Sequence, residues 1–198
     1  MHNPILVILA GGASSRMWPL REKSLLRFGD EPLLLAQLHR YKSMGFTQAV
    51  IVGNPENTEV IREMTADFQR IHVQVVTQPE PKGMGDALLR AGAVLPLDEH
   101  PAIYVNQVHD VTESALPLDL IDSFRSDPSA SYLAGVERED YFPGGYLIVD
   151  ADGRITGMVE KPGAANRPSN LVNIVAHIHA DATRLLEAIE QQYRIAAS

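Results

Sequence analysis

Basic side chains follow the first apolar segment of the sequence, just beyond a pair of glycines. The stretch LVILAGGASSRMWPLREKSLL covers residues 6–26 and places Arg16 and Lys23 after Gly11 and Gly12. Glycines let a backbone approach a ligand without a Cβ in the way, and successive N–H groups there can form an anion-binding nest. A guanidinium offers a planar fork to phosphate oxygens, and an ammonium offers a mobile charge. The stretch therefore predicts a phosphate cradle, although a flexible surface connection would use similar residues.

Two further segments carry side chains that could bind a nucleotide and a metal. QPEPKG begins at Gln78, whose amide can both donate and accept hydrogen bonds, as reading a nucleobase edge requires. Gly83 ends this segment and lets the backbone approach a flat base or a ribose. Asp110 follows the apolar stretch AIYVNQ, and a carboxylate there could hold Mg²⁺ together with phosphate oxygens. Taken singly, the first segment also fits a plain strand-to-helix connection, and the second an aspartate bonded within its loop.

A last polar pair lies at the end of the segment MVEKPG. Glu160 can accept hydrogen bonds from sugar hydroxyls while Lys161 meets a phosphate. An adjacent Glu-Lys pair is more often a solvated surface pair, so its meaning depends on the other segments.

The elements that must position these residues follow from hydrophobic periodicity. Short apolar runs alternate with amphipathic stretches up to residue 130, which predicts a parallel sheet whose strand ends meet at one edge. We expect strands at 5–11, 49–53, 73–78 and 102–107, and helices at 32–45, 56–70, 85–95 and 116–127. Pro32 suits the first position of its helix.

After residue 130 the pattern becomes rich in strands. We expect the strands SYLAGVER, GYLIVD, ITGMVEKP and LVNIVAHIH, with a hairpin turn at Asp152-Gly153. A last helix at 181–193 begins at Asp181, an acceptable N-cap. We interpret residues 1–198 as one domain, with a nucleotide-binding half (1–130) and a strand-rich half (131–198).

Composition excludes several classes of protein. The 198 residues carry a formal net charge of −8, which argues against a nucleic-acid binder because phosphate backbones need a basic surface. No apolar run approaches the ~20 residues that span a bilayer, so we expect no membrane partner. The absence of cysteine excludes disulfides and thiolate metal sites, and suits a cytoplasmic protein. The oligomeric state is open.

The ordered set of motifs resembles the sugar-phosphate nucleotidyltransferases, also called NDP-sugar pyrophosphorylases. The set comprises LAGG with the arginine and lysine beyond it, QPEPKG, a strand followed by aspartate, GGYLIVDADGRITGMVEKP and VN. The resemblance is greatest to the glucose-1-phosphate thymidylyl- and uridylyltransferases. It implies a Rossmann-like (GT-A-like) α/β fold, in which helices flank a mostly parallel mixed sheet. It also implies Mg²⁺ as cofactor and a reaction of an NTP with a sugar 1-phosphate to give an NDP-sugar and pyrophosphate.

The resemblance also implies a role for each matching residue. Arg16 would hold the departing pyrophosphate, Lys23 would neutralise phosphate charge, and Asp110 would carry Mg²⁺. The residues that would contact the substrates are Leu9, Gly11 and Gly12 at the nucleotide, Gln78 and Gly83 at the base, Gly145, Glu160 and Asn173 at the sugar, and Lys161 at the sugar phosphate.

The chain departs from the family pattern at several points, which leaves two alternatives. Ser14-Ser15 replaces the usual Gly-Thr, and Ala176 or a neighbour replaces a glycine expected after Asn173. Lys23 follows Arg16 at a shorter interval than usual, as in the molybdenum-cofactor guanylyltransferases, so a cofactor guanylyl- or cytidylyltransferase is one alternative. The family usually has a second metal-binding aspartate further downstream. Without it, a catalytically weak NDP-sugar-binding domain is the other alternative.

Overall fold

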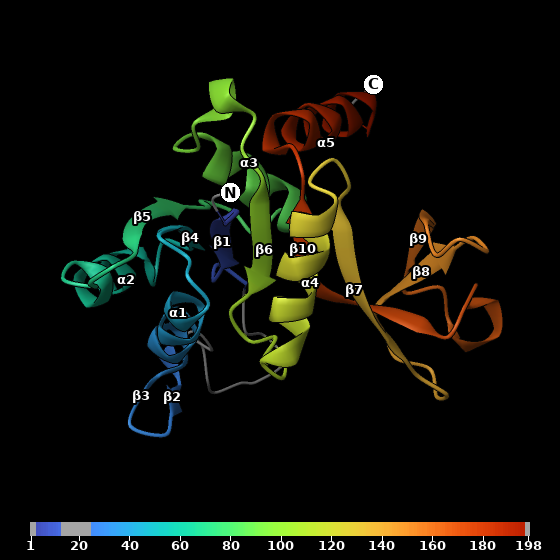
Figure 1. The fold of residues 1–198 in the computed structure, drawn as a ribbon, viewed down its shortest axis with the longest axis horizontal. Helices are drawn as coiled ribbons and strands as arrows, with labels where there is room; N and C mark the ends of the chain where they lie inside the picture. The colour runs from blue at the N-terminus through green and yellow to red at the C-terminus, as the bar shows by residue number, and fades with distance from the viewer. Residues whose placement is uncertain (1–2, 13–24, 197–198) are drawn as a thin grey trace.

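A computed structural model describes residues 3–12 and 25–196, and its centre is one mixed sheet (Figure 1). The eight strands run in the order β5-β4-β1-β6-β10-β8-β9, and β7 pairs with β10. Predicted Arg16 and Lys23 lie outside the described residues.

The first half of the chain forms the parallel part of the sheet. Strands β1 (Ile5–Leu9), β4 (Gln48–Gly53), β5 (His72–Thr77) and β6 (Ile103–Gln107) all run in the same direction. Leu6, Val7 and Ile8 of β1 are fully buried, because helices cover both faces of the sheet. This burial explains why the strand reads as a continuous apolar run rather than as an alternating one.

Helices cover the sheet in two layers. One face packs against α1 (Leu33–Ser43), α2 (Thr58–Thr65) and α4 (Ala115–Ser126). The other face packs against α3 (Met84–Gly92) and α5 (Ala182–Ala196), which lie next to each other in Figure 1. The mixed α/β sheet flanked by helices that the sequence predicts is therefore confirmed.

The second half of the chain is antiparallel, as its strand-rich sequence predicts. Strand β10 (Leu171–His179) pairs with β7 (Tyr132–Glu137), and β8 (Gly145–Val149) forms a hairpin with β9 (Ile155–Glu160). Gly153 turns the hairpin with a φ of 78°, which a residue with a Cβ rarely adopts.

The long strand β10 changes partner half-way along its length. Its residues Ala176–His179 pair with β6, whereas Val172 pairs with Tyr146 of β8 on the same edge. The loop that follows β6 therefore leaves the sheet beside the middle of β10, at the point where β6 ends and β8 begins. This change of partner places the end of β6 next to residues from the second half of the chain.

Some element boundaries differ from the sequence predictions. Helix α1 begins at Leu33, so Pro32 is the N-cap rather than the first helical residue. Helix α2 spans eight residues, and the chain then turns into β5 with Arg70 at a φ of 73°. The predicted cap at Asp181 is confirmed, because its Oδ1 accepts the backbone N–H of Arg184 at 3.0 Å. The remaining elements are short: β2 (Arg27–Phe28), β3 (Glu31–Pro32), η3 (Leu97–Glu99) and η4 (Ala164–Asn166).

Candidate active site

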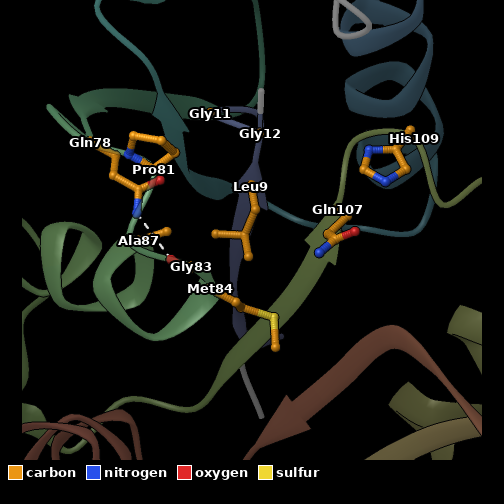
Figure 2. Close-up of a pocket in the computed structure, with 10 residues that line it drawn as sticks. All are labelled: Leu9, Gly11, Gly12, Gln78, Pro81, Gly83, Met84, Ala87, Gln107 and His109. Atoms are coloured by element: carbon orange, nitrogen blue, oxygen red, sulfur yellow. Dashed lines mark hydrogen bonds between the residues drawn. The ribbon is translucent and has the colours of Figure 1, made fainter. Parts of the chain in front are cut away.

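A first cavity of about 260 Å³ opens at the carboxyl ends of β1 and β6 (Figure 2). Ligands of open α/β sheets bind at this edge. The cavity is lined by Leu9, Gly11, Gly12, Gln78, Pro81, Gly83, Met84, Ala87, Gln107 and His109. The sequence analysis selected five of these residues and missed the other five. Among those missed, Met84 and Ala87 belong to the face of α3, which only the tertiary structure brings to the cavity.

Gln78 is held by bonds that use both hydrogens of its side-chain amide. Nε2 lies 3.0 Å from the carbonyl oxygen of Gly83 and 2.8 Å from Oδ2 of Asp86. Arg90 in turn donates to Oδ1 of Asp86 at 3.2 Å. The expectation that Gln78 both donates to and accepts from a ligand therefore needs correction. Both hydrogens on Nε2 are engaged, so Oε1 is the atom of this amide that can bond a ligand. Gln78 therefore presents a hydrogen-bond acceptor to the cavity.

Gly11 is required by the approach of two backbone segments. A Cβ on Gly11 would lie 3.0 Å from the carbonyl oxygen of Gly53 in β4, too close for an unstrained contact. A Cβ on Gly12 would meet no heavy atom within 4 Å. The glycine pair therefore combines a packing requirement at Gly11 with open space at Gly12, where the backbone is exposed to a ligand.

Helix α1 holds the loop that follows β6. Gln37 donates to the carbonyl oxygen of Val108 at 3.3 Å, and Arg40 donates to Oγ1 of Thr112 at 3.2 Å and to the carbonyl oxygen of Glu113 at 2.7 Å. Bonds from one helix to both ends of a loop limit the positions that the loop can adopt. Asp110 lies between these attachment points.

Asp110 is partly buried, with 26% of its side chain exposed. This burial raises the pKa of its carboxyl above the ordinary value, while His109 nearby and a hydrogen bond from the backbone N–H of Val175 act in the opposite direction. Asn106 donates to the carbonyl oxygen of Val175 at 3.1 Å, which ties the end of β6 to β10.

An irregularity in β10 makes these bonds possible. Between Ile174 and His177 the strand advances by three residues, while its partner β7 advances by one, from Ala134 to Leu133. Val175 in this bulge can therefore direct its backbone groups to Asp110 and Asn106 rather than to a strand ladder.

The predicted sugar-binding residues form a row across three strands. Gly145 of β8 lies opposite Glu160 of β9, and Val172 of β10 lies opposite Tyr146. Continuing this antiparallel register by one residue places Asn173 opposite Gly145. Residues opposite each other in a ladder project from the same face, so Asn173, Gly145 and Glu160 share one face of the sheet.

Lys161 follows this row directly. Its φ of 45° is uncommon for a residue with a Cβ, and its backbone N–H donates to the carbonyl oxygen of Gly144 at 3.0 Å. Its Nζ lies 3.4 Å from Oε1 of Glu160, and both side chains are exposed. The pair therefore remains accessible to a ligand.

A second cavity of about 320 Å³ adjoins the first at His109. It is lined by His109, Asp110, Val111, Thr112, Val136, Arg138, Phe142, Val172, Asn173 and Ile174. Among the described residues that line the two cavities, Asp110 is the single carboxylate. No group of three or more potential metal ligands occurs in residues 3–12 and 25–196.

Comparison with known proteins places the chain in a family. The family model described as nucleotidyl transferase matches residues 5–190. The chain belongs to the nucleotidyl transferase family. It is 27% identical over 190 residues to the low-salt glycan biosynthesis nucleotidyltransferase Agl11 of Haloferax volcanii, covering 93% of this chain and 51% of that protein. It is 26% identical over 189 residues to the mannose-1-phosphate guanylyltransferase catalytic subunit beta of Drosophila pseudoobscura pseudoobscura, and the match covers 93% of this chain and 49% of that protein. The chain thus spans about half the length of these curated relatives.

Solved structures agree with the family in fold. The crystal structure of UDP-glucose pyrophosphorylase complexed with UDP-glucose superposes with a TM-score of 0.76 at 20% identity, covering 96% of this chain and 80% of that one. The crystal structure of apo-UDP-glucose pyrophosphorylase gives a TM-score of 0.75 at 19% identity, and the match covers 93% of this chain and 80% of that one. Within the described residues, no helix is long and apolar enough to cross a membrane.

Proposed function

We propose that this chain carries out nucleotidyl transfer from an NTP to a sugar 1-phosphate, giving an NDP-sugar and pyrophosphate. The observation that supports this proposal most directly is the junction of β6, β8 and β10. There the first cavity, the Asp110 loop and the row Asn173–Gly145–Glu160 meet. Family membership and the sugar 1-phosphates named for several relatives point the same way.

In the proposed arrangement the base occupies the first cavity and the sugar lies over the row. Gln78 accepts a hydrogen bond from the base, and Gly83 and Leu9 line its site. Gly11 and Gly12 let the backbone approach the nucleotide. Asn173 and Glu160 bind the sugar, and Lys161 binds its phosphate. The residues that bind the sugar and its phosphate thus come from the second half of the chain, and those that bind the nucleotide come from the first half.

The reaction needs no covalent intermediate with the protein. A phosphate oxygen of the sugar 1-phosphate attacks the α-phosphorus of the NTP in line, a new P–O bond forms, and the bond to the β-phosphate oxygen breaks to release pyrophosphate. The protein contributes positioning and neutralisation of charge. Arg16 and Lys23, in the segment outside the described residues, would act on the pyrophosphate and the other phosphates.

Asp110 fits a Mg²⁺ ion in its donor chemistry. Mg²⁺ prefers oxygen ligands and is commonly held by one or two carboxylates together with phosphate oxygens and waters. When bound, the ion would supply charge neutralisation at the triphosphate. Asp110 would hold it with one carboxylate oxygen, and the bond from Val175 would keep the carboxylate in place.

A panel assay of pyrophosphate release tests the proposal. Purified protein is incubated with Mg²⁺, each common NTP, and glucose, mannose or N-acetylglucosamine 1-phosphate. We expect release with at least one pair and loss of release in Arg16→Ala. Thermal stabilisation by NDP-sugars with no release from any pair would instead favour a domain that binds without turnover.

A further inference from the structure

Two side chains of β10 meet although they are four residues apart in the strand. Nε2 of His177 lies 2.9 Å from Oδ1 of Asn173. A regular strand rises about 3.3 Å per residue, which would separate these positions by roughly 13 Å. The bulge between Ile174 and His177 shortens this separation and brings the imidazole to the amide. The contact therefore depends on the same irregularity that directs Val175 to Asp110.

The histidine is placed to hold the amide without adding a charge. His177 is 3% exposed, and burial together with the neighbouring ring of His179 lowers its pKa to about 4. The ring is thus neutral at neutral pH. Because an amide oxygen only accepts hydrogen bonds, this contact requires the proton of the neutral ring on Nε2. With Oδ1 engaged, the Nδ2 group of Asn173 is directed away from the imidazole.

The strands on either side give Asn173 no lateral support. Its partner on β7 is Gly135, and Gly145 follows on β8 by register. Neither glycine has a side chain that could restrain the amide. In the described part of the chain, His177 is the hydrogen-bond partner of the Asn173 side chain.

We propose that His177 is a positioning residue, which fixes the Asn173 amide so that Nδ2 meets the sugar 1-phosphate. This inference rests on the proposed sugar-binding role of Asn173. It assigns to a buried histidine a part in substrate recognition rather than in packing alone. It also makes the β10 bulge a shared support, since the bulge positions both the Asp110 carboxylate and the Asn173 amide.

The test compares four single variants and one double variant. His177→Phe removes the hydrogen bond and keeps a buried ring, whereas His177→Gln keeps a polar group of similar reach. His179→Phe is the matched control, because His179 is a partly buried histidine on β10 that contacts the ring of His177 rather than Asn173. Asn173→Ala and the Asn173→Ala/His177→Phe double variant complete the cycle.

We expect His177→Phe to raise the KM for the sugar 1-phosphate about five- to tenfold, the usual effect of losing one hydrogen bond to a polar ligand group. The KM for the NTP should change less than about twofold, because the NTP does not meet Asn173. His177→Gln should recover most of the loss, and His179→Phe should resemble the wild type. The double variant should be no worse than Asn173→Ala, because the histidine acts through the asparagine.

Equal KM values in wild type and His177→Phe would overturn the inference while leaving the proposed function intact. So would additive losses in the double variant, or the same loss in His179→Phe. If the wild type releases no pyrophosphate from any substrate pair, the proposed function fails instead. The side-chain amide resonances of Asn173 then decide the positioning role: we expect them to shift in His177→Phe and not in His179→Phe, and no shift in either would overturn it.

Discussion

The side-chain amide of Gln78 donates one hydrogen to Asp86, 2.8 Å away, and the other to the carbonyl oxygen of Gly83. The opposite orientation of this amide would set Oε1 against a carboxylate and a carbonyl, so the charge of Asp86 fixes the orientation. Asp86 is itself buried and carries an ion pair with Arg90. A buried carboxylate outside the cavity thereby determines which atom Gln78 presents inside it.

Replacing Asp86 with Asn should therefore weaken nucleotide binding. The neutral amide no longer selects one orientation of Gln78, so we expect NTP affinity to fall about threefold to tenfold, in line with the loss of one hydrogen bond. Calorimetric titration with the NTP preferred by the wild type measures this. Arg90→Gln is the control, since it removes the half-exposed partner and leaves the carboxylate. Unchanged affinity in Asp86→Asn would show that Gln78 does not depend on Asp86.

Asp110→Asn should abolish Mg²⁺-dependent pyrophosphate release and leave the fold intact. The amide keeps the size of the side chain but not the charge that holds a divalent ion. Burial raises the pKa of Asp110. As the pH is lowered, the wild-type rate should therefore begin to fall at a higher pH than it would if Asp110 had the pKa of an ordinary aspartate. A pH–rate profile together with a circular dichroism spectrum of the variant checks both parts. Full activity in Asp110→Asn would exclude Asp110 as the metal ligand.

Two histidines of β10, the buried His177 and the partly buried His179, should make the protein less stable in acid. Burial lowers the pKa values of His177 and His179 to about 4 in the folded protein, against 6.5 for an ordinary histidine. Between pH 4 and pH 6.5 the unfolded chain therefore binds protons at these two histidines that the folded chain does not bind. As the pH falls from 6.5 towards 4, the free energy of unfolding should decrease by up to about 1.4 kcal/mol per pH unit for each ring.

Urea unfolding at pH 7, 5.5 and 4.5 measures this dependence. A double variant with Gln at both positions supplies the control, because carboxyl groups such as Asp110 titrate in both proteins. The wild type should show the steeper decline. Parallel declines would show that the two rings titrate normally in the folded protein.

The sequence predicted the order and type of the main elements, because β1, β4 and β6 are buried within the sheet and read as apolar runs. It also selected Gln78 and Asp110 from their places after strands. It could not predict that Asp86 and the carbonyl oxygen of Gly83 together take both hydrogens of the Gln78 amide, since these contacts depend on how helix α3 packs. The bulge in β10 was likewise not predicted, because LVNIVAHIH reads as a regular strand. His177 and Asn173 meet only through this bulge.

Lys161 offers a test that separates the two substrates. Its φ of 45° means that Lys161→Ala would combine loss of charge with backbone strain, so Lys161→Gly and Lys161→Arg are the better variants. We expect Lys161→Gly to raise the KM for the sugar 1-phosphate about tenfold or more, as expected for a charged hydrogen bond, with the NTP KM nearly unchanged. Lys161→Arg should retain most of the activity. A loss confined to thermal stability would instead make the Glu160–Lys161 pair structural.

The adjacent glycines of the loop after β1 should respond differently to the same substitution. A Cβ on Gly11 would lie 3.0 Å from the carbonyl oxygen of Gly53, so Gly11→Ala requires the backbones of β1 and β4 to separate by a few tenths of an ångström. We expect it to lower the free energy of unfolding by about 1–3 kcal/mol, as overpacking does, and to weaken NTP binding. A Cβ on Gly12 would have no heavy atom within 4 Å, so Gly12→Ala should leave stability within about 0.5 kcal/mol. If the backbone at Gly12 approaches the nucleotide, its variant should lose NTP affinity without losing stability. Urea unfolding and nucleotide titration of both variants distinguish these effects, and equal stability losses at the two positions would contradict the arrangement described.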